Sequence, residues 1–356
     1  MFYREAGQYK TSYAADMAVF PLRQDRVGIA VIIAAALALS FANDFIVQAV
    51  LIPFLVFSLA AIGLNILTGY AGLLSLGTGA FMGVGAYACY KLTTAFPGVN
   101  ILVWILVSGL FSAAVGTLFG LPSLRIKGFY LAVATLAAQF FLQWCFNRVP
   151  WLFNYNVSGA IEAPLRTLFG VPIVGPAAQP QTRYLVLLGL VILLTWVASN
   201  LVHGRIGRAW MAVRDMDIAA ELMGIKLLPT KLLAFAVSSY FCGVAGAAMV
   251  FLWYGSAEYT VFDINQSFSV LFMVIIGGLG SLIGSFFGAA FISILPTVLK
   301  FGLPALGVPI EAATAEHLTA ILVGALIILF LIIEPHGLAR LWQIGKQKLR
   351  VWPFPY

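Results

Sequence analysis

The feature that most constrains this chain is its succession of long apolar runs, which few charged residues interrupt. Of its 356 residues, 62% are hydrophobic, only 9% are charged, and the mean hydropathy is +1.00. These values lie far outside the range of soluble domains. Because helices satisfy all their backbone hydrogen bonds internally, the sequence predicts an all-α integral membrane protein that crosses the bilayer many times.

A membrane-spanning helix needs roughly 20 mostly apolar residues, and ten candidate spans can be read from the runs. They are residues 27–43, 45–67, 73–94, 101–121, 129–146, 184–202, 232–253, 266–282, 284–300 and 317–334. The third, eighth and ninth contain so many glycines that we expect broken or re-entrant segments there, over residues 69–81 and 277–291.

Ten spans place both termini on one side of the membrane, and the positive charges indicate which side. Of the 20 Lys and Arg residues, fifteen then fall on the side of the termini and five on the other. Since Lys and Arg are enriched in cytoplasmic loops, both termini are expected in the cytoplasm. The expected parts are a cytoplasmic N-terminal segment, 1–26, a transmembrane domain, 27–334, and a cytoplasmic tail, 335–356.

Two connections between spans are long. The external loop, 147–183, contains prolines and aromatic residues that predict a structured cap or an interfacial segment rather than a loose loop. The cytoplasmic loop, 203–231, carries much of the charge of the chain.

Residues that could carry chemistry are absent from the middle of the predicted spans. The acidic residues and the three histidines fall at span ends or in loops, and the three cysteines are scattered singly. We therefore expect no catalytic site, no metal site and no cofactor in this chain, and no mid-span carboxylate for ion coupling. The basic residues lie at span ends rather than in a stripe, which argues against binding of nucleic acid. A transporter of this kind is either a passive channel or driven by a separate motor.

One stretch of the cytoplasmic loop, "RDMDIAAELMGIK" at residues 214–226, has the pattern of a short helix. Asp217 is expected to cap it, two alanines favour it and leave a slim surface, and Gly224 stands where helices commonly end. A helix this short is not stable alone and needs a surface to pack on. Spacing alone leaves two readings open: a polar loop helix packed on the bundle, or an element that docks onto a partner.

Four stretches resemble one known family, in the family's own order. "GRAWMAVRDMDIAAELMGI" is similar to the coupling loop of ABC importer permeases, in particular of the branched-chain amino acid ABC transporter permease family and its LivM-type subunits. "GLNILTGYAGLLSLGTGAFMGVGAY", "VIIGGLGSLIGSFFGAAFISIL" and "EPHGLARLW" resemble its N-terminal signature, its glycine-rich span and its closing segment. Thr78 departs from the pattern, since many relatives carry His there, and the aromatic-rich external segment is also unusual for the family.

The resemblance implies a non-catalytic permease subunit of an ATP-driven ABC importer, in the inner membrane of a bacterium, for branched-chain or related amino acids. The implied partners are a second related permease subunit, two ABC ATPase subunits that bind ATP and Mg, a periplasmic solute-binding protein and the lipid bilayer. Alternative solutes are urea, short amides, and aromatic or organic acids. A self-contained secondary carrier is the alternative class.

Two sets of candidate site residues follow. The coupling set, implied by the resemblance, consists of Arg205, Arg208, Arg214, Asp217, Ala219, Ala220, Glu221 and Gly224. The path set comes from the two glycine-rich stretches, which share a Gly-x-x-Gly opening and are possible counterparts lining a substrate path. It consists of Gly69, Gly72, Ser75, Thr78, Gly277, Gly278, Gly280 and Ser281. The alternative reading of these glycines is close helix packing through small residues.

Overall fold

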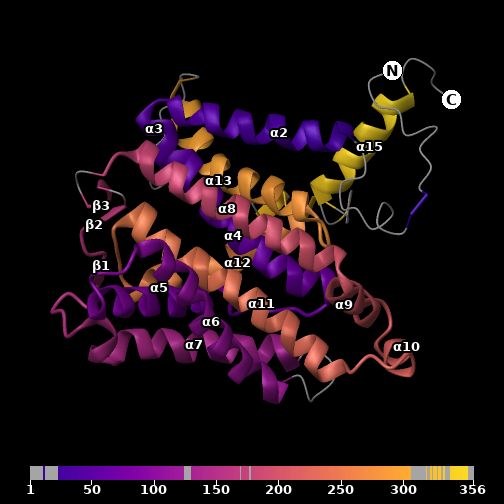
Figure 1. Cartoon of the computed structure of the whole chain (residues 1–356), viewed down its shortest axis with the longest axis horizontal. Coiled ribbons are helices and arrows are strands. Elements are labelled where there is room, and N and C mark those ends of the chain that lie inside the picture. The colour runs from indigo at the N-terminus through magenta and orange to yellow at the C-terminus, as the bar shows by residue number, and fades with distance from the viewer. Residues whose placement is uncertain are drawn as a thin grey trace.

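The computed structural model describes residues 11–12, 23–123, 130–168, 170–175, 178–305 and 337–351, with isolated residues between 318 and 332. Within these residues the chain forms a bundle of elongated helices (Figure 1). Four helical segments are long and apolar enough to cross a membrane: Asp44–Tyr70, Ile101–Pro122, Pro180–His203 and Leu227–Tyr254. Three shorter apolar helices are Arg26–Phe41, Ile264–Gly277 and Leu282–Val298. The expected helical membrane protein is thus consistent with the structure.

The first half of the chain contains one long helical segment followed by three further helices. The segment is preceded by α2 (Arg23–Ala38) and the 3-10 turn η1 (Leu39–Phe41). It consists of α3 (Asp44–Ile46), the π-helical η2 (Val47–Leu51), α4 (Ile52–Asn65) and the π-helical η3 (Ile66–Tyr70). The three helices that follow are α5 (Thr78–Ala95), α6 (Ile101–Ser123) and α7 (Tyr130–Arg148).

The second half contains two short helices between longer ones. Its elements are α8 (Pro180–His203), α9 (Arg205–Asp215), α10 (Asp217–Leu222), α11 (Leu227–Ala248) and the π-helical η5 (Met249–Tyr254). They continue with the 3-10 turn η6 (Tyr259–Phe262), α12 (Ile264–Gly277), α13 (Leu282–Ala305) and α15 (Gly337–Val351).

Helix α11 lies at the centre of the bundle and packs against α4, α5 and α6. Its small residues permit this, because helices in lipid associate mainly through close packing. A Cβ atom on Gly85 of α5 would lie only 2.0 Å from the carbonyl oxygen of Gly243 in α11. The two backbones therefore touch. Within the segment Leu227–Tyr254, 83% of an apolar stretch of 18 residues is buried inside the protein.

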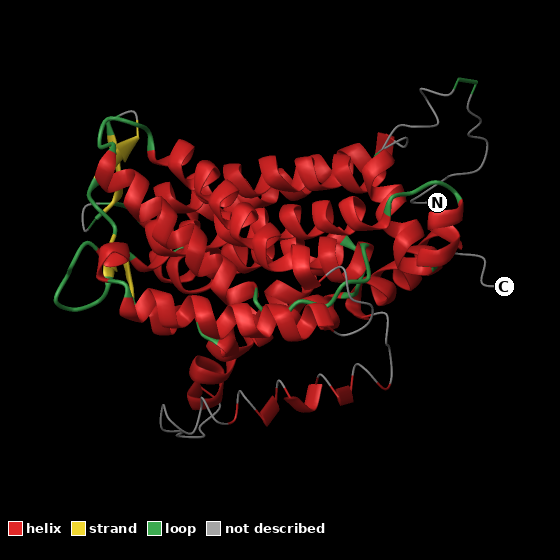
Figure 2. Cartoon of the chain, turned by 90° about the horizontal axis from the view of Figure 1, so that it is seen from below, coloured by secondary structure: helices red, strands yellow, loops and turns green. Residues whose placement is uncertain are grey.

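Short strands gather at one end of the bundle, and α9, α10 and α15 lie at the other (Figures 1 and 2). Strand β1 (Ile161–Glu162) pairs antiparallel with β4 (Ser256–Ala257), and β2 (Arg166–Leu168) pairs antiparallel with β3 (Val171–Val174). The turn η4 (Pro150–Phe153) precedes them. The described residues of 147–183 thus contain an ordered turn and strands, and the first residues of α8, which begins at Pro180.

Both glycine-rich stretches interrupt helices, as expected from their composition. Residues 71–77, here called the first break, separate η3 from α5, and residues 278–281, the second break, separate α12 from α13. Gly72, Gly278 and Gly280 adopt φ angles of +69°, +114° and +75°, which side chains other than glycine rarely allow.

The breaks correct three predicted span boundaries. The predicted span 73–94 is wrong at its start, because the helix begins only at Thr78. The predicted span 266–282 ends early, at Gly277, and the predicted span 284–300 begins at Leu282 and continues to Ala305. Most of the predicted span 317–334 lies outside the described residues.

Candidate coupling and substrate-path site

Helix α9 is attached to the N-terminal turns of α11. The Trp210 side chain is fully buried, and its Nε1 atom donates a hydrogen bond of 3.1 Å to the carbonyl oxygen of Thr230. In the next helix, the Asp217 carboxylate lies 3.7 Å from the Nζ atom of Lys231. Both contacts attach the short helices to the first turns of α11, so α9, α10 and the start of α11 form one connected unit.

Helix α10 begins and ends close to the predicted residues, but its capping differs at the start. Asp217 is the first helical residue, Met216 occupies the N-cap position, and no side chain caps the helix. The prediction that Asp217 caps α10 is therefore wrong, and its carboxylate pairs with Lys231 instead. Gly224 ends the helix as predicted: its φ is +87°, and the Ile225 amide donates to the Ala220 carbonyl at 3.0 Å.

The residues of the coupling set differ in how far their side chains are exposed to solvent. Ala220 is fully buried and Ala219 is half-buried, so the alanine face of α10 turns toward the protein instead of offering a slim outer surface. Arg205, Arg208, Arg214, Glu221 and Gly224 are exposed, and Asp217 is half-buried.

Four large apolar side chains are exposed on and around α10. They are Leu222, Met223, Met216 and Ile218, with exposed fractions of 85%, 70%, 66% and 63%, and we call them the α10 patch. Large apolar side chains clustered at one exposed place commonly mark a surface that a partner covers. The patch lies on a helix of six residues. Sequence reasoning, which followed the charged residues and alanines, missed it.

The end of η3, directly before the first break, contacts the second break. A Cβ atom on Gly69 would lie 2.2 Å from the backbone nitrogen of Gly280, so the two backbones are in contact. The buried amide of Asn65, at the end of α4, adds hydrogen bonds to the second break: its Oδ1 atom accepts from the Gly280 amide at 2.9 Å. Its Nδ2 atom donates to the Ser281 carbonyl at 2.8 Å and to the Ser285 Oγ atom at 2.9 Å. Gly69, Gly280 and Ser281 of the path set are thereby brought together.

Arg214 connects the coupling set to this junction. Its Nη1 atom donates a hydrogen bond of 2.8 Å to the carbonyl oxygen of Gly69, while its Nε atom bonds to Asp215 Oδ1 at 2.9 Å. A Cβ atom on Gly72 would lie 2.8 Å from the Cγ atom of Arg214. The guanidinium stands at the C-terminal end of a long helical segment, where carbonyl groups lack helical partners and a cation is favoured.

Ser75 and Thr78 of the path set lie in a separate buried network at the start of α5. The Ser75 Oγ atom accepts from the Gly77 amide at 3.4 Å, and the Thr78 Oγ1 atom has no partner among the described residues. Side chains of neighbouring helices hold the backbone here. The Leu76 amide donates to Thr135 Oγ1, the Gly79 amide to Ser267 Oγ, and the Ala80 amide to Gln139 Oε1, at 2.9, 2.8 and 2.7 Å.

The two remaining path residues, Gly277 and Gly278, lie where helices pack closely. A Cβ atom on Gly277 would lie 2.0 Å from the carbonyl oxygen of Gly284 in α13, and one on Gly337 would lie 2.6 Å from the backbone nitrogen of Gly278. For these two glycines the contacts are those of close packing, the alternative that the sequence left open.

Asn65 and Gln139 were missed by the sequence reasoning, although Asn65 binds the second break and Gln139 binds the first turn of α5. Both are completely buried, and Gln139 also donates to the Phe262 carbonyl at 2.7 Å. Asn65 stands as a single amide residue in the apolar run "GLNIL", and Gln139 stands in the apolar run "LAAQFFLQ", four residues before Gln143. A buried amide in a membrane is costly unless it finds hydrogen-bond partners, so an isolated Asn or Gln in a span is a usable signal.

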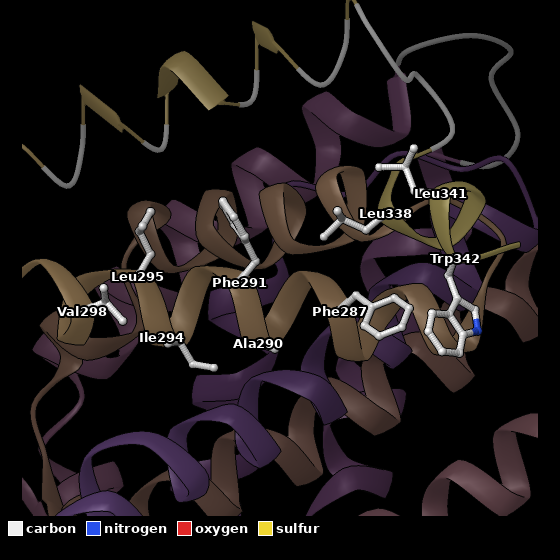
Figure 3. A pocket seen from close by; sticks show the side chains of 9 residues that line it. All are labelled: Phe287, Ala290, Phe291, Ile294, Leu295, Val298, Leu338, Leu341 and Trp342. Atoms are coloured by element: carbon white, nitrogen blue, oxygen red, sulfur yellow. The ribbon is translucent and has the colours of Figure 1, made fainter. Parts of the chain in front are cut away.

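An apolar groove of about 650 Å³ lies between α13 and α15 (Figure 3). Phe287, Phe291 and Val298 of α13 and Leu338 and Trp342 of α15 are among its lining residues. A small polar solute is oriented by a few placed polar groups. The Trp342 indole is the only polar side chain of this lining, so the groove does not resemble a site for such a solute.

Comparison with known proteins gives one consistent result. Residues 46–331 match the family described as "Branched-chain amino acid transport system / permease component". The chain is 29% identical over 307 residues to the "High-affinity branched-chain amino acid transport system permease protein LivM" of Salmonella typhimurium, which covers 80% of this chain and 68% of that protein. The protein of the same name from Escherichia coli gives the same identity and coverage. The "Autoinducer 2 import system permease protein LsrC" of an Enterobacter species is 31% identical over 56% of this chain and 57% of its own.

Proposed function

Because the chain belongs to the family of branched-chain amino acid transport system permease components, we propose that it is the transmembrane permease subunit of an ATP-driven ABC importer. In this role it is a non-catalytic transport subunit, and ATP and Mg are bound by partner subunits. It translocates branched-chain or related amino acids that a periplasmic binding protein delivers.

The observation that carries the proposal is the α10 patch, which lies on a helix that is attached to the bundle. A six-residue helix is too short to be stable alone, and its burial of Ala220 together with the Asp217–Lys231 pair fixes it on the bundle. Leu222 of the same helix and Met223, which follows it, are exposed. A fixed helix with an apolar outer surface is suited to docking into a groove of a partner, here the ATPase subunit.

The charge distribution supports the orientation of the subunit. We place α9, α10, α15 and both termini in the cytoplasm of a bacterium, because fifteen of the 20 Lys and Arg residues then lie inside. The strands at the other end of the bundle then face the periplasm, where the binding protein docks. A second related permease subunit completes the pathway, and two ATPase subunits bind below, with ten spans as the proposed count.

The proposed solute follows from the printed names of the relatives. Two of them are named as branched-chain amino acid permeases, and a third is named for import of autoinducer 2. The family thus includes permeases named for different solutes, and urea, short amides and aromatic or organic acids remain the alternative cargo for this chain.

Reconstitution of the complete importer tests the proposal. Proteoliposomes that contain this chain, its second permease and its ATPase subunits receive the binding protein and radiolabelled leucine. We expect uptake that requires ATP and the binding protein, and that unlabelled isoleucine and valine compete while urea, acetamide and benzoate do not. Competition by urea or benzoate alone would move the assignment to another solute. Ion-driven uptake by this chain without partners would identify a secondary carrier and refute the proposal.

A further inference from the structure

Three parts of the chain that are distant in sequence meet at the Arg214 side chain. It belongs to the last turn of α9, its Nη1 atom bonds to the carbonyl oxygen of Gly69, and its Cγ atom packs against Gly72 in the first break. A Cβ atom on Gly280, in the second break, would lie 3.3 Å from the same Nη1 atom. Arg214 therefore contacts both breaks from α9, one of the two short helices between α8 and α11.

The hydrogen bonds of Arg214 hold its guanidinium in one orientation. Its Nε atom bonds to Asp215 in the same helix, and Nη1 is thereby directed at Gly69. An arginine suits this place because its planar group donates in two fixed directions, whereas a lysine is a single mobile cation. The bond to Asp215 makes the guanidinium move with α9.

The hydrogen bond from Arg214 to Gly69 joins two parts of the protein, and contacts within each part hold its helices together. On one side, Trp210 and Asp217 attach α9 and α10 to α11. On the other side, Asn65 joins the end of α4 to the second break by hydrogen bonds to Gly280 and Ser281. Helix α9 also packs on η3. Between these two units, the charged hydrogen bond from Arg214 to Gly69 is a directional contact that a shift of α9 would stretch.

We propose that Arg214 is a positioning residue that transmits movement of α9 and α10 to both glycine-rich breaks. The inference rests on the proposed function, in which a partner ATPase moves α10. When α9 shifts, Arg214 displaces the Gly69 carbonyl at the end of η3, which leads into the first break. The second break follows because Asn65 and the Gly69–Gly280 contact join it to the same α4–η3 segment. Arg214 thus couples the motor to the substrate path from inside this chain, rather than by binding the motor.

The test measures leucine uptake and ATP hydrolysis in the same proteoliposomes with the complete importer. For Arg214→Gln, which removes the cation and the directed donor pair, we expect assembly and ATP hydrolysis to persist. The leucine taken up per ATP should fall roughly fivefold or more, the order expected for loss of a charged hydrogen bond. Arg214→Lys, which keeps the cation, should restore part of the ratio. Lys226→Gln is the matched control, since it removes an exposed positive charge close by and should leave the ratio unchanged.

Each outcome decides one point. A ratio for Arg214→Gln within twofold of the wild type overturns the inference, as does an equal loss in Lys226→Gln. If the Arg214→Gln complex does not assemble, Asp215→Asn replaces it, because Asp215 is exposed and holds only the Nε atom. That variant should lower the ratio about twofold to threefold for the same reason, and an unchanged ratio overturns the inference. A wild-type complex without ATP-dependent uptake refutes the proposed function itself.

Discussion

Truncation of Leu222 to alanine should weaken binding of the ATPase subunit, and the structure sets the scale of the effect. The Leu222 side chain is 85% exposed, so docking has nearly the whole side chain to bury. Leu→Ala removes three carbon atoms, each contributing about 0.8 kcal/mol when buried, which gives an upper limit of about 2.4 kcal/mol. At about 1.4 kcal/mol for each factor of ten, the Kd should rise by up to roughly 50-fold. Since alanine favours helix, α10 itself is not weakened.

The assay is a titration of detergent-purified permease with labelled ATPase subunit, followed by fluorescence anisotropy. The matched control is Leu165→Ala, because Leu165 is 73% exposed at the opposite end of the bundle. We expect its Kd to stay within twofold of the wild type. A Kd for Leu222→Ala that is equally unchanged would show that the α10 patch is not the docking surface, and an equal loss in both variants would remove its specificity.

Substitutions at three further residues test the contacts that hold the site, each by thermal unfolding of the purified protein in detergent. Trp210→Ala should lower the free energy of unfolding by about 3–5 kcal/mol, because a fully buried indole is lost. Trp210→Phe should lower it by only about 1 kcal/mol, because the hydrogen bond to Thr230 is lost. Similar decreases for the two variants would contradict this expectation. Gln139→Leu leaves the Ala80 amide without its acceptor, so a loss on the order of 1–3 kcal/mol is expected, and an unchanged Tm contradicts it. Asp217→Asn should cost less than about 1 kcal/mol, since its ion pair is partly exposed, and a larger loss would contradict this small contribution of the pair to the attachment of α10.

The positions of the breaks could be predicted from local sequence, but their boundaries could not. The density of glycine in "TGYAGLLSLGTGAF" signals an interrupted helix, and the structure has the interruption there. The residue at which α5 starts depends on other helices, because Thr135, Gln139 and Ser267 bind the amides at its first turn. Contacts between residues about 60 and 190 positions apart leave no local pattern, so the predicted start was five residues early.

The same distinction explains the error at Asp217. An acidic residue before two alanines has the composition of an N-cap, and composition is all that local reasoning can use. In the folded chain, Lys231 comes within 3.7 Å of the carboxylate because α11 packs beside α10. Gly224 was predicted correctly, since a left-handed residue at the end of a helix is a local requirement that glycine alone satisfies without strain.

The contacts of the coupling set also indicate which side chains contribute most to the free energy of binding a partner. Two of its five charged side chains are engaged within the described part of the chain: Asp217 with Lys231, and Arg214 with Asp215 and Gly69. An ion pair already formed inside the chain contributes little to a partner, because breaking it offsets what a new pair gains. The exposed groups that gain most from contact are therefore the apolar side chains of the α10 patch. Affinity for the motor then depends on apolar burial on the outer face of α10, while the internal charges transmit its movement.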